Sequence, residues 1–378
     1  MGETLKIAVV GLGNRGPQHL CTIVGIPDRY RLVGICDMVP EKLQAAADRF
    51  GAPGFSNAEE MMDRARPDLV VFTVSHRDLS NLVKLAADRK IHVATETPIA
   101  ATLPVADLLI ETARRGNIKL ENFEQCWRWP REQLKRRVLT SGVLGEMVQA
   151  RCYTYIAPYH ATGVFLKMVG SHVRQVVGYG RELRICPQQK TGSPYASTRK
   201  WVIGALEFEN GVSGVFEMKV RQPYISGHDF SNCAADCTQG HILHEEVYIA
   251  KDAARPKAGG AHQERGNLVH YPIQEGWEEI QGRRILTKVW IDTDPEISWE
   301  NPYRQYAPEP VYPGGDDYGR LEEYISYHRA IVEDTAPEYG VAEARHNIEV
   351  MIAAAHSARL GSQTLTLPLD PKVEMSFW

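Results

Sequence analysis

The sequence predicts an α/β fold with a doubly wound parallel sheet for its first 125 residues, followed by antiparallel structure. Two observations support the parallel sheet. A short apolar run at residues 5–10 ends in a Gly-x-Gly-x-x-Gly pattern, and apolar runs then alternate with amphipathic stretches. Farther on, Asn-Gly at 210–211 separates two strand-like runs, which is typical of a β-hairpin. We therefore divide the chain into domains 1–125 and 126–378.

The composition is that of a globular protein, with 43% hydrophobic and 24% charged residues among 378. The net charge is −4 and no basic block stands out, so we expect neither nucleic acid nor a membrane surface as a partner. No apolar run approaches the roughly 20 residues of a membrane span.

Cysteine usage and the N-terminus predict a cytoplasmic protein. The seven cysteines are scattered and odd in number, which is typical of reduced thiols. The first strand begins by residue 5 and leaves no room for an export signal. The cysteines and histidines at 233–244 lack the long separation of a zinc finger, so we expect no metal site.

The residues after the first strand form a candidate diphosphate-binding loop. Gly11 permits a tight turn, Gly13 lets the backbone approach a diphosphate, and Gly16 lets the next helix pack closely on the strand. The N–H groups at the start of that helix would face the phosphates. An ordinary glycine turn has the same composition, so the pattern alone is weak evidence. The candidate cofactor-binding residues of the loop are Gly11, Leu12, Gly13, Asn14, Arg15 and Gly16.

An acid at the end of the second strand strengthens this interpretation. The strand spans 31–36, and Asp37 lies about 20 residues beyond Gly16. At this spacing a carboxylate can accept hydrogen bonds from the adenosine ribose and would repel a phosphate on its 2′ position. Met38 and Val39 offer no cation to receive that phosphate. The spacing therefore predicts NAD, in preference to NADP, as the cofactor.

The rest of the first domain alternates helices and strands. The run at 68–74 is almost continuously apolar, as expected for a parallel strand buried on both faces. Ser75 and His76 follow it, at the strand end where ligands collect, so His76 lies either near the nicotinamide or in an exposed loop. We expect helices at 40–50, 58–65, 79–86 and 105–112, and strands near Phe55 and at 91–94 and 118–120.

In the second domain we expect strands at 148–156, 201–208 and 212–220, and helices at 165–178, 320–332 and 342–360. The stretch 221–315 is rich in Gly, Pro, His and Trp, and we expect it to be irregular. It would then form loops over the site or an interface.

Four segments together resemble the Gfo/Idh/MocA family of glucose–fructose oxidoreductase and inositol dehydrogenase. They are GLGNRG (11–16), the strand ending in Asp37, HVATETPIAAT (92–102) and GSH (170–172). The segment AHSARLG (355–361) with the following TLPL is also similar. The resemblance covers almost the whole chain. It implies an N-terminal Rossmann domain, a C-terminal α+β domain with a large open antiparallel sheet, a nicotinamide cofactor, and a sugar or polyol substrate.

Two departures from the family concern proton transfer. The family usually has Glu-Lys-Pro where this chain has Glu-Thr-Pro at 96–98, and Thr97 has no charge to lower the pKa of a reacting hydroxyl. The family's Asp-x-Gly-x-His pattern appears at 168–172 with Met168 in place of the aspartate. Lys167 beside it is either a catalytic cation from another direction or a surface lysine.

The resemblance also suggests roles for several residues. His172, on the helix expected at 165–178, is the candidate base, because a histidine pKa lies near neutrality. Glu96 and Gln125 would hold the nicotinamide side of the pocket, with Thr97, Ser75 and His76 as further cofactor contacts. Besides His172, the candidate substrate contacts are Trp127, Arg128 and Tyr155, where a sugar can stack on an aromatic face. The alternative for the tryptophans is packing at a domain junction.

The predicted activity is hydride transfer between a carbohydrate or polyol carbon and NAD. The first alternative is glycoside cleavage through transient oxidation at C3, which regenerates NAD in each cycle. The second is a catalytically weak NAD-binding subunit or sensor, and the third is reduction of a non-sugar carbonyl or imine. An open sheet face favours a homodimer or homotetramer.

Overall fold

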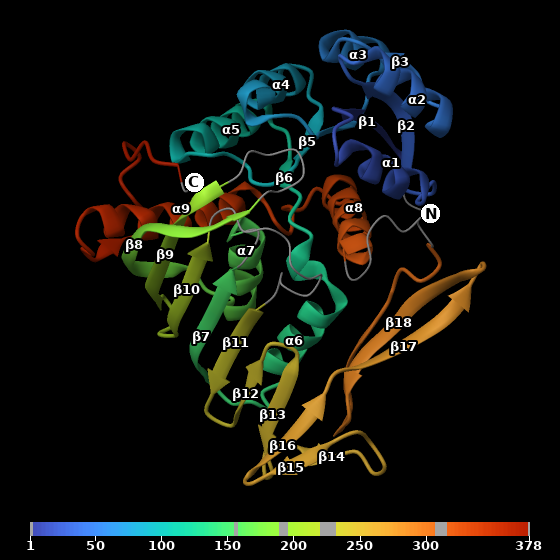
Figure 1. Ribbon diagram of the computed structural model, residues 1–378. Coiled ribbons are helices and arrows are strands. Elements are labelled where there is room, and N and C mark those ends of the chain that lie inside the picture. Colours follow the sequence, from blue (N-terminus) through green and yellow to red (C-terminus); the bar gives the residue numbers. More distant parts are fainter. Residues whose placement is uncertain (1–2, 155–157, 189–195, 220–231, 307–315, 377–378) are drawn as a thin grey trace. The chain divides into compact units, whose positions relative to one another are not determined.

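The structure is a computed structural model that describes residues 3–154, 158–188, 196–219, 232–306 and 316–376 (Figure 1). No helix in these ranges is long and apolar enough to cross a membrane. The chain forms two compact units. The first unit contains Met1–Gln125, Tyr306–Ile348 and Pro371–Glu374, and the second contains Cys126–Gln305, Glu349–Asp370 and Met375–Trp378. The first unit thus takes in a segment that the sequence division placed in the second domain.

The first unit is built on a six-stranded sheet with the order β3-β2-β1-β4-β5-β6. Every neighbouring pair of strands is parallel, which confirms the doubly wound sheet. The strands are β1 (Leu5–Val10), β2 (Tyr30–Cys36), β3 (Gly54–Phe55), β4 (Leu69–Phe72), β5 (His92–Thr95) and β6 (Leu120–Asn122).

Helices connect these strands, and residues in or just before their first turns help to set where the helices begin. A proline lies in the first turn of three of them, where the missing N–H removes no hydrogen bond. At the start of another, the Asn57 side chain accepts a hydrogen bond from Glu60 N at 2.9 Å. The helices are α1 (Gly16–Val24), α2 (Pro40–Phe50), α3 (Ala58–Ala65), α4 (His76–Asp88) and α5 (Leu103–Gly116).

The register of the parallel strands places four strand ends in one row. Val10 pairs with Phe72, Phe72 with Thr95, and Thr95 with Asn122. The segments that follow these residues leave the sheet at the same edge. The glycine loop, the turn before α4, Glu96 and the residues up to Gln125 therefore gather there, as expected for the ligand side of a doubly wound sheet.

Helix α8 (Asp316–Val332) packs into the first unit through buried aromatic rings. Tyr324 contacts the rings of Phe123 and Tyr30 at centroid distances of 5.0 and 5.7 Å. The Tyr327 hydroxyl donates to the carbonyl oxygens of Val93 and Lys119 at 2.7 and 2.8 Å. These contacts explain why residues distant in sequence belong to this unit.

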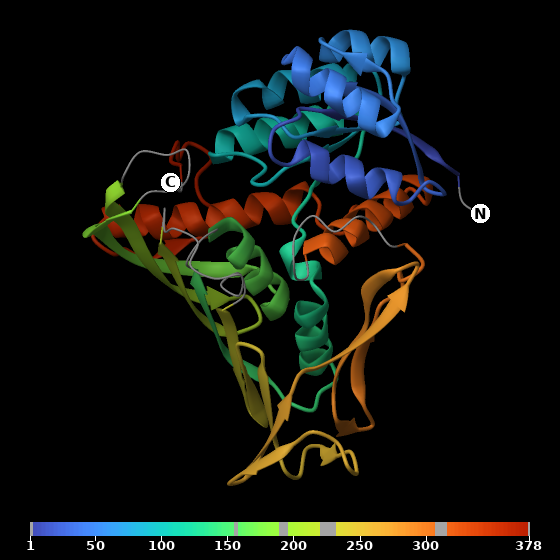
Figure 2. The same cartoon turned by 45° about the vertical axis from the view of Figure 1, so that its right-hand side comes forward.

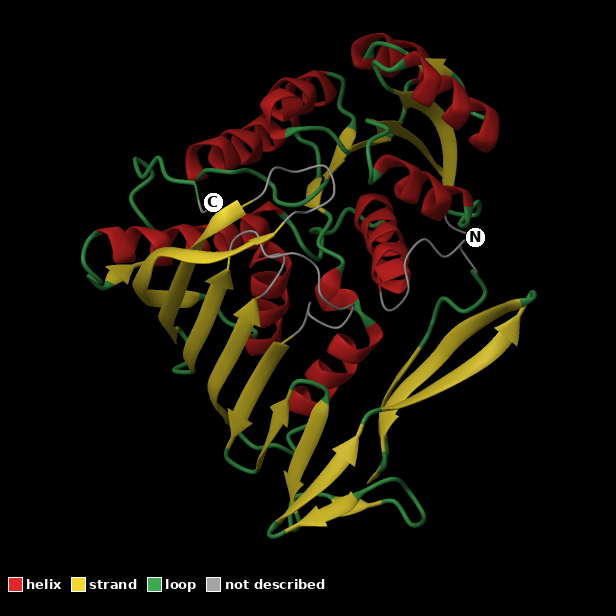
Figure 3. Ribbon diagram, in the orientation of Figure 1, coloured by secondary structure: helices red, strands yellow, loops and turns green. Residues whose placement is uncertain are grey.

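The second unit contains a ten-stranded, mostly antiparallel sheet (Figure 3). Its order is β15-β16-β13-β12-β11-β7-β10-β9-β8-β21, and only β7 and β10 pair in parallel. This confirms the large sheet that the resemblance implies. The central strands are β7 (Met147–Thr154), β8 (Val173–Gln188), β9 (Ala196–Phe208), β10 (Ser213–Lys219) and β11 (Asn232–Cys237), and β21 (Leu365–Thr366) lies at the edge.

The expected helix at 165–178 is wrong. Helix α7 spans Pro158–Val169, and Gly170 ends it with a φ of +66°, a conformation that favours glycine. The chain then enters β8, where Val173 and Val176 are buried and Arg174 is exposed. The short apolar run there is compatible with both element types, and tertiary pairing with β9 selects the strand.

The expectation of irregular structure at 221–315 is also wrong for the described part of that stretch. Its described residues form short strands joined by polar or glycine-rich turns. Each strand is too short for an alternating hydrophobic pattern to be recognised in the sequence. Figure 2 shows the long β17–β18 hairpin. The strands are β12 (Gly240–Leu243), β13 (Glu246–Ala250), β14 (Arg255–Pro256), β15 (Gln263–Arg265), β16 (Leu268–Pro272), β17 (Gln274–Ile280), β18 (Arg283–Ile291), β19 (Thr293–Asp294) and β20 (Ile297–Glu300).

The remaining helices are α6 (Pro130–Thr140), which packs on α7, and α9 (Val341–Arg359), whose second half belongs to the second unit. Strand β8 lies directly against α9. A Cβ atom on Gly178 would stand 1.9 Å from the Ala354 carbonyl oxygen, and Gly178 N donates to Ser357 Oγ at 2.8 Å. Only a residue without a side chain allows this approach.

We therefore predict that Gly178→Ala destabilises the protein by about 1–3 kcal/mol, because the strand must move away from α9. Urea unfolding followed by circular dichroism measures the change. Gly276→Ala in β17 is the matched control, since its Cβ would lie 3.4 Å from the Trp290 side chain, an ordinary contact. Equal losses for the two variants would contradict this account of the packing.

Candidate cofactor and active site

The glycine loop between β1 and α1 has the shape of a diphosphate cradle. Gly11 has a φ of +99°, and a Cβ there would lie 2.6 Å from the Thr73 carbonyl oxygen. A Cβ on Gly16 would lie 2.1 Å from the Gly11 oxygen, whereas a Cβ on Gly13 would meet nothing within 4 Å. The first and third glycines thus permit the fold of the loop, and the second leaves open space beside the helix N-terminus. This arrangement fits a dinucleotide diphosphate.

Asp37 is tied to this loop by its carboxylate. Its Oδ2 accepts a hydrogen bond from Leu12 N at 2.5 Å, and its Oδ1 accepts one from Val39 N at 2.8 Å. Each oxygen keeps a second lone pair for another donor. Met38 beside it is 85% exposed and uncharged. These acceptors suit a ribose diol, and the Met38 side chain offers no charge to a 2′-phosphate.

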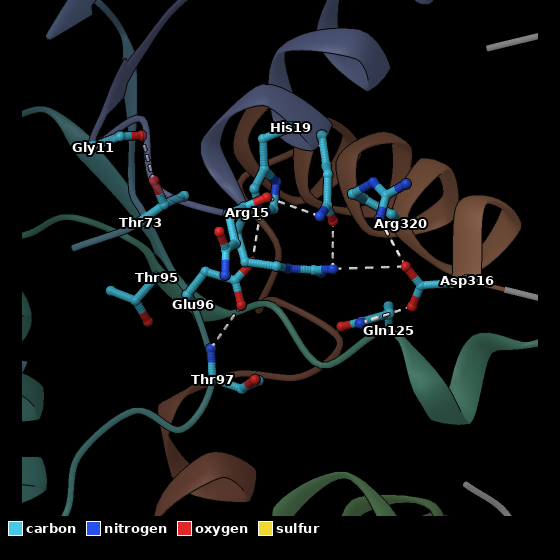
Figure 4. A network of polar contacts seen from close by, with 12 residues as sticks. Gly11, Arg15, His19, Thr73, Thr95, Glu96, Thr97, Gln125, Asp316 and Arg320 are labelled. Carbon is cyan, nitrogen blue, oxygen red and sulfur yellow. Dashed lines mark hydrogen bonds and ion pairs between the residues drawn. The ribbon is translucent and has the colours of Figure 1, made fainter. Parts of the chain in front are cut away.

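Arg15, the residue before Gly16, is held between two carboxylates (Figure 4). Its Nε donates to Glu96 Oε1 at 2.8 Å, and its Nη1 lies 3.7 Å from Asp316 Oδ2. Nη1 also donates to Gln18 Oε1 at 2.6 Å. Burial alone would lower the pKa of Arg15, but the charges of Glu96 and Asp316 outweigh it and raise the pKa. Sequence reasoning placed Arg15 and Glu96 at the cofactor separately, and the structure brings them into contact.

His19 lies one turn beyond Gly16 on α1 and contacts Glu96 from the protein interior. The Nε2 to Oε1 distance is 2.6 Å, and His19 is fully buried. Burial raises the pKa of the Glu96 carboxyl, but Arg15 and His19 outweigh it, so this pKa lies well below its usual range. Glu96 is therefore ionised at neutral pH. Sequence reasoning missed His19, and the only signal was its position three residues after Gly16, on the buried side of the helix.

Helix α8 contributes Asp316 and Arg320, which sequence reasoning also missed. Asp316 Oδ2 accepts a hydrogen bond from Arg320 Nη1 at 2.8 Å, and its Oδ1 accepts one from Gln125 Nε2 at 2.9 Å. Burial raises the pKa of Asp316, but Arg320 and Arg15 outweigh it and lower the pKa. Gln125 Oε1 is buried and has no hydrogen-bond partner among the described residues. It can accept a hydrogen bond from an amide N–H of a bound ligand.

Three further cofactor candidates lie at the same sheet edge. Thr97 N donates to Glu96 Oε2 at 3.2 Å. His76 starts α4 and is half-buried, not in an exposed loop, and burial lowers its pKa. Its Nδ1 is buried without a hydrogen-bond partner among the described residues. Ser75 is exposed at the N-terminus of α4, and its hydroxyl makes no capping bond.

In the second unit, Trp127 is surrounded by cations. The guanidinium of Arg128 lies 4.3 Å from the ring centroid, that of Arg136 4.7 Å, and Lys167 Nζ 4.8 Å. Trp127 is 2% exposed, so the structure favours the packing alternative for this ring over a sugar platform. Arg128 is itself buried. Lys167 and Arg136 also line a cavity of about 330 Å³ between α6 and α7.

The candidate base His172 is exposed in the turn between α7 and β8. Its carbonyl oxygen accepts a hydrogen bond from Glu209 N at 2.9 Å, next to the turn of the β9–β10 hairpin. Tyr155 lies outside the described residues.

A second histidine of this unit, His160, was missed by the sequence reasoning. It lies near the other end of α7, and one of its ring nitrogens is within 4.8 Å of Cys126 Sγ. Its sequence context contains no motif that separates it from a packed histidine.

Comparison with known proteins identifies the first unit. Residues 5–122 match the GFO_IDH_MocA family, described as an oxidoreductase family with an NAD-binding Rossmann fold. The first third of the chain thus carries the NAD-binding Rossmann fold of this family. The match covers β1 to β6, the elements that carry the glycine loop, Asp37 and Glu96.

Curated relatives match part of the chain. Inositol 2-dehydrogenase of Salmonella typhimurium is 24% identical over 155 residues, which are 40% of this chain and 46% of that protein. A glycosyl hydrolase family 109 protein of Porphyromonas gingivalis is 28% identical over 158 residues, which are 39% and 34% of the two chains. The matches thus cover less than half of these relatives' lengths.

Among solved structures, levoglucosan dehydrogenase in complex with NADH and levoglucosan aligns with a TM-score of 0.71 and 16% identity. The alignment covers 97% of this chain and 100% of that one. At this identity the similarity establishes the fold.

We predict that Asp37→Ala weakens NAD binding by about 10- to 100-fold, since a hydrogen bond to a charged group contributes about 1.5–3 kcal/mol. Isothermal titration calorimetry with NAD measures the change. Glu41→Ala is the control, because Glu41 is an exposed acid in the first turn of α2, four positions along the chain. Unchanged affinity in Asp37→Ala would contradict the placement of the ribose.

Proposed function

We propose that the protein is an NAD-dependent dehydrogenase that transfers a hydride between the nicotinamide and a hydroxyl-bearing carbon of a sugar, glycoside or polyol. The observation that carries this proposal is the Asp37–Leu12 hydrogen bond beside the open space at Gly13. It joins a ribose acceptor to a diphosphate cradle, as NAD requires. A sugar or polyol substrate is supported by two similar proteins, an inositol 2-dehydrogenase and a levoglucosan dehydrogenase.

When bound, NAD supplies the carbon that gives or takes the hydride. The glycine loop binds the diphosphate, and Asp37 accepts hydrogen bonds from the ribose. Glu96 and Gln125 Oε1 accept hydrogen bonds on the nicotinamide side. Thr97 has no charge, so the proton of the reacting hydroxyl has to go to a group outside the Glu-Thr-Pro segment.

We propose a histidine of the second unit as that base, and we compare two, His160 and His172. The sequence pattern favours His172. The structure favours His160, which lies near the start of α7 and beside Cys126. A ring nitrogen of His160 lies within 4.8 Å of Cys126 Sγ, and Cys126 directly follows Gln125 in the sequence. The 12 residues of α7 span about 18 Å, and His172 lies beyond its far end. We therefore take His160 as the leading candidate.

Glycoside cleavage through transient oxidation is the second candidate function. The match to a glycosyl hydrolase family 109 protein favours it. Oxidation at C3 of a sugar acidifies the proton on C2, which permits elimination of the aglycone. Water then adds across the resulting C1–C2 double bond, and the hydride returns to C3, so no net NADH forms. The same cofactor site serves both functions.

We predict that the purified protein binds NAD and reduces it in the presence of one member of a panel of sugars, cyclitols and glycosides. Absorbance at 340 nm measures NADH, and chromatography measures aglycone release. Stoichiometric NADH supports the dehydrogenase, and aglycone release without NADH supports cleavage. NAD binding without either product would contradict both and favour the sensor.

We predict that His160→Gln lowers kcat by about 100-fold or more, the usual contribution of a general base, and leaves the Kd for NAD nearly unchanged. His172→Gln is the matched comparison on the same segment. We expect it to retain most of its turnover, because its side chain is exposed. A large loss in His172→Gln with little loss in His160→Gln would reverse the assignment. The pH profile of kcat should lose its ionisation near neutrality only in the variant that removes the base.

A further inference from the structure

We propose that His19 and Tyr324 form a positioning pair that holds Glu96, and through it Arg15, in the geometry that the cofactor site needs. This inference rests on the proposed function for its kinetic consequence. Its structural part concerns residues of the first unit alone. None of these positioning contacts involves a residue of the second unit.

Both ring nitrogens of His19 are engaged. Nε2 lies 2.6 Å from Glu96 Oε1, and Nδ1 lies 2.8 Å from the Tyr324 hydroxyl. His19 and Tyr324 are both fully buried. The Phe123 ring stacks on His19 at a centroid distance of 6.0 Å, so the imidazole is also held from its face.

The protons in this chain of contacts can be placed from chemistry. Glu96 is ionised and can only accept, so the His19 proton is on Nε2. Nδ1 is then an acceptor, and the Tyr324 hydroxyl donates to it. Burial lowers the pKa of His19 and raises that of Tyr324, so both groups are neutral. One tautomer of His19 therefore satisfies every contact.

On the Tyr324 side, the chain of contacts ends in the protein interior. The Tyr324 carbonyl oxygen accepts a hydrogen bond from the Tyr30 hydroxyl at 2.7 Å, and Tyr30 is 3% exposed. A proton wire needs an exit, and the described residues give none here. The pair therefore fits a positioning role and does not fit proton delivery.

The consequence for the site lies in the two oxygens of Glu96. Oε1 accepts from both His19 and Arg15, and Oε2 accepts from Thr97 N at 3.2 Å. Because His19 and Arg15 both hold Oε1, the orientation of the whole carboxylate, including Oε2, is fixed. Because His19 fixes Glu96 Oε1, that oxygen stays in place to accept from Arg15 Nε. The glycine loop and the end of β5 are thereby held together. A small displacement of such groups costs up to about 100-fold in rate.

The test uses His19→Leu, His19→Gln and Tyr324→Phe in the full-length protein. Leucine removes both polar contacts, whereas glutamine can still donate to Glu96. Tyr324→Phe removes only the hydroxyl on Nδ1. Tyr327→Phe is the matched control, because it removes a buried hydroxyl one turn away on α8 that bonds backbone oxygens.

We predict that His19→Leu lowers kcat by about 10- to 100-fold with little change in the Kd for NAD, and that His19→Gln recovers much of the loss. Tyr324→Phe lowers kcat by a smaller factor, and Tyr327→Phe leaves it unchanged although both Tyr→Phe variants lose thermal stability. Equal kinetic losses in the two Tyr→Phe variants, or full turnover in His19→Leu, would overturn the proposal.

A second readout is independent of turnover. Nitrogen-15 NMR of the histidine side chains at neutral pH should show His19 as the uncharged Nε2–H tautomer, because burial lowers its pKa. The charged and titratable groups that face it are Glu96, Arg15, Arg320 and Tyr324. In Tyr324→Phe, Nδ1 loses its donor, and the pKa of His19 should rise. A wild-type Nδ1–H tautomer would overturn the proposal even if no substrate is found, whereas the expected spectrum without turnover would fault only the proposed function.

Discussion

The ion pair between Arg15 and Glu96 is the interaction on which the cofactor site depends. It joins the loop after β1 to the end of β5, two segments separated by β4 in the sheet. Both partners are largely covered, so each charge would be costly alone. The surrounding contacts offset the free energy of burying these charges. Gln18 and Asp316 both contact Nη1 of the guanidinium, and His19 donates to the carboxylate without adding a charge.

Because the pair is buried within one unit, the acids at this edge have fixed roles. Glu96 and Asp316 both have pKa values lowered by arginines, so neither is suited to take a proton at neutral pH. Under the proposed function, the base is then a group outside this edge of the sheet, because Thr97 has no charge. The first unit in that proposal binds and orients the cofactor.

The sequence predicted the first unit well, because its signals are local. Strand-to-helix turns, glycine spacing and the acid after β2 each involve neighbours in sequence, and parallel pairing then places the candidates at one edge. His19, Asp316 and Arg320 escaped prediction because their roles arise from packing between α1 and α8, about 300 residues apart. The helix expected around His172 failed because a short apolar run permits either element, and pairing with β9 decided it.

The position of the base follows the same reasoning. A GSH motif suggested His172, but a motif carries a role only if its element is the expected one. Once α7 ends at Val169, His172 is in an exposed turn and has lost the helical frame on which the resemblance relied. His160 is on that helix, beside the residue that leaves the Rossmann unit. For this reason the proposed function takes His160, which is on α7, as the leading candidate for the base.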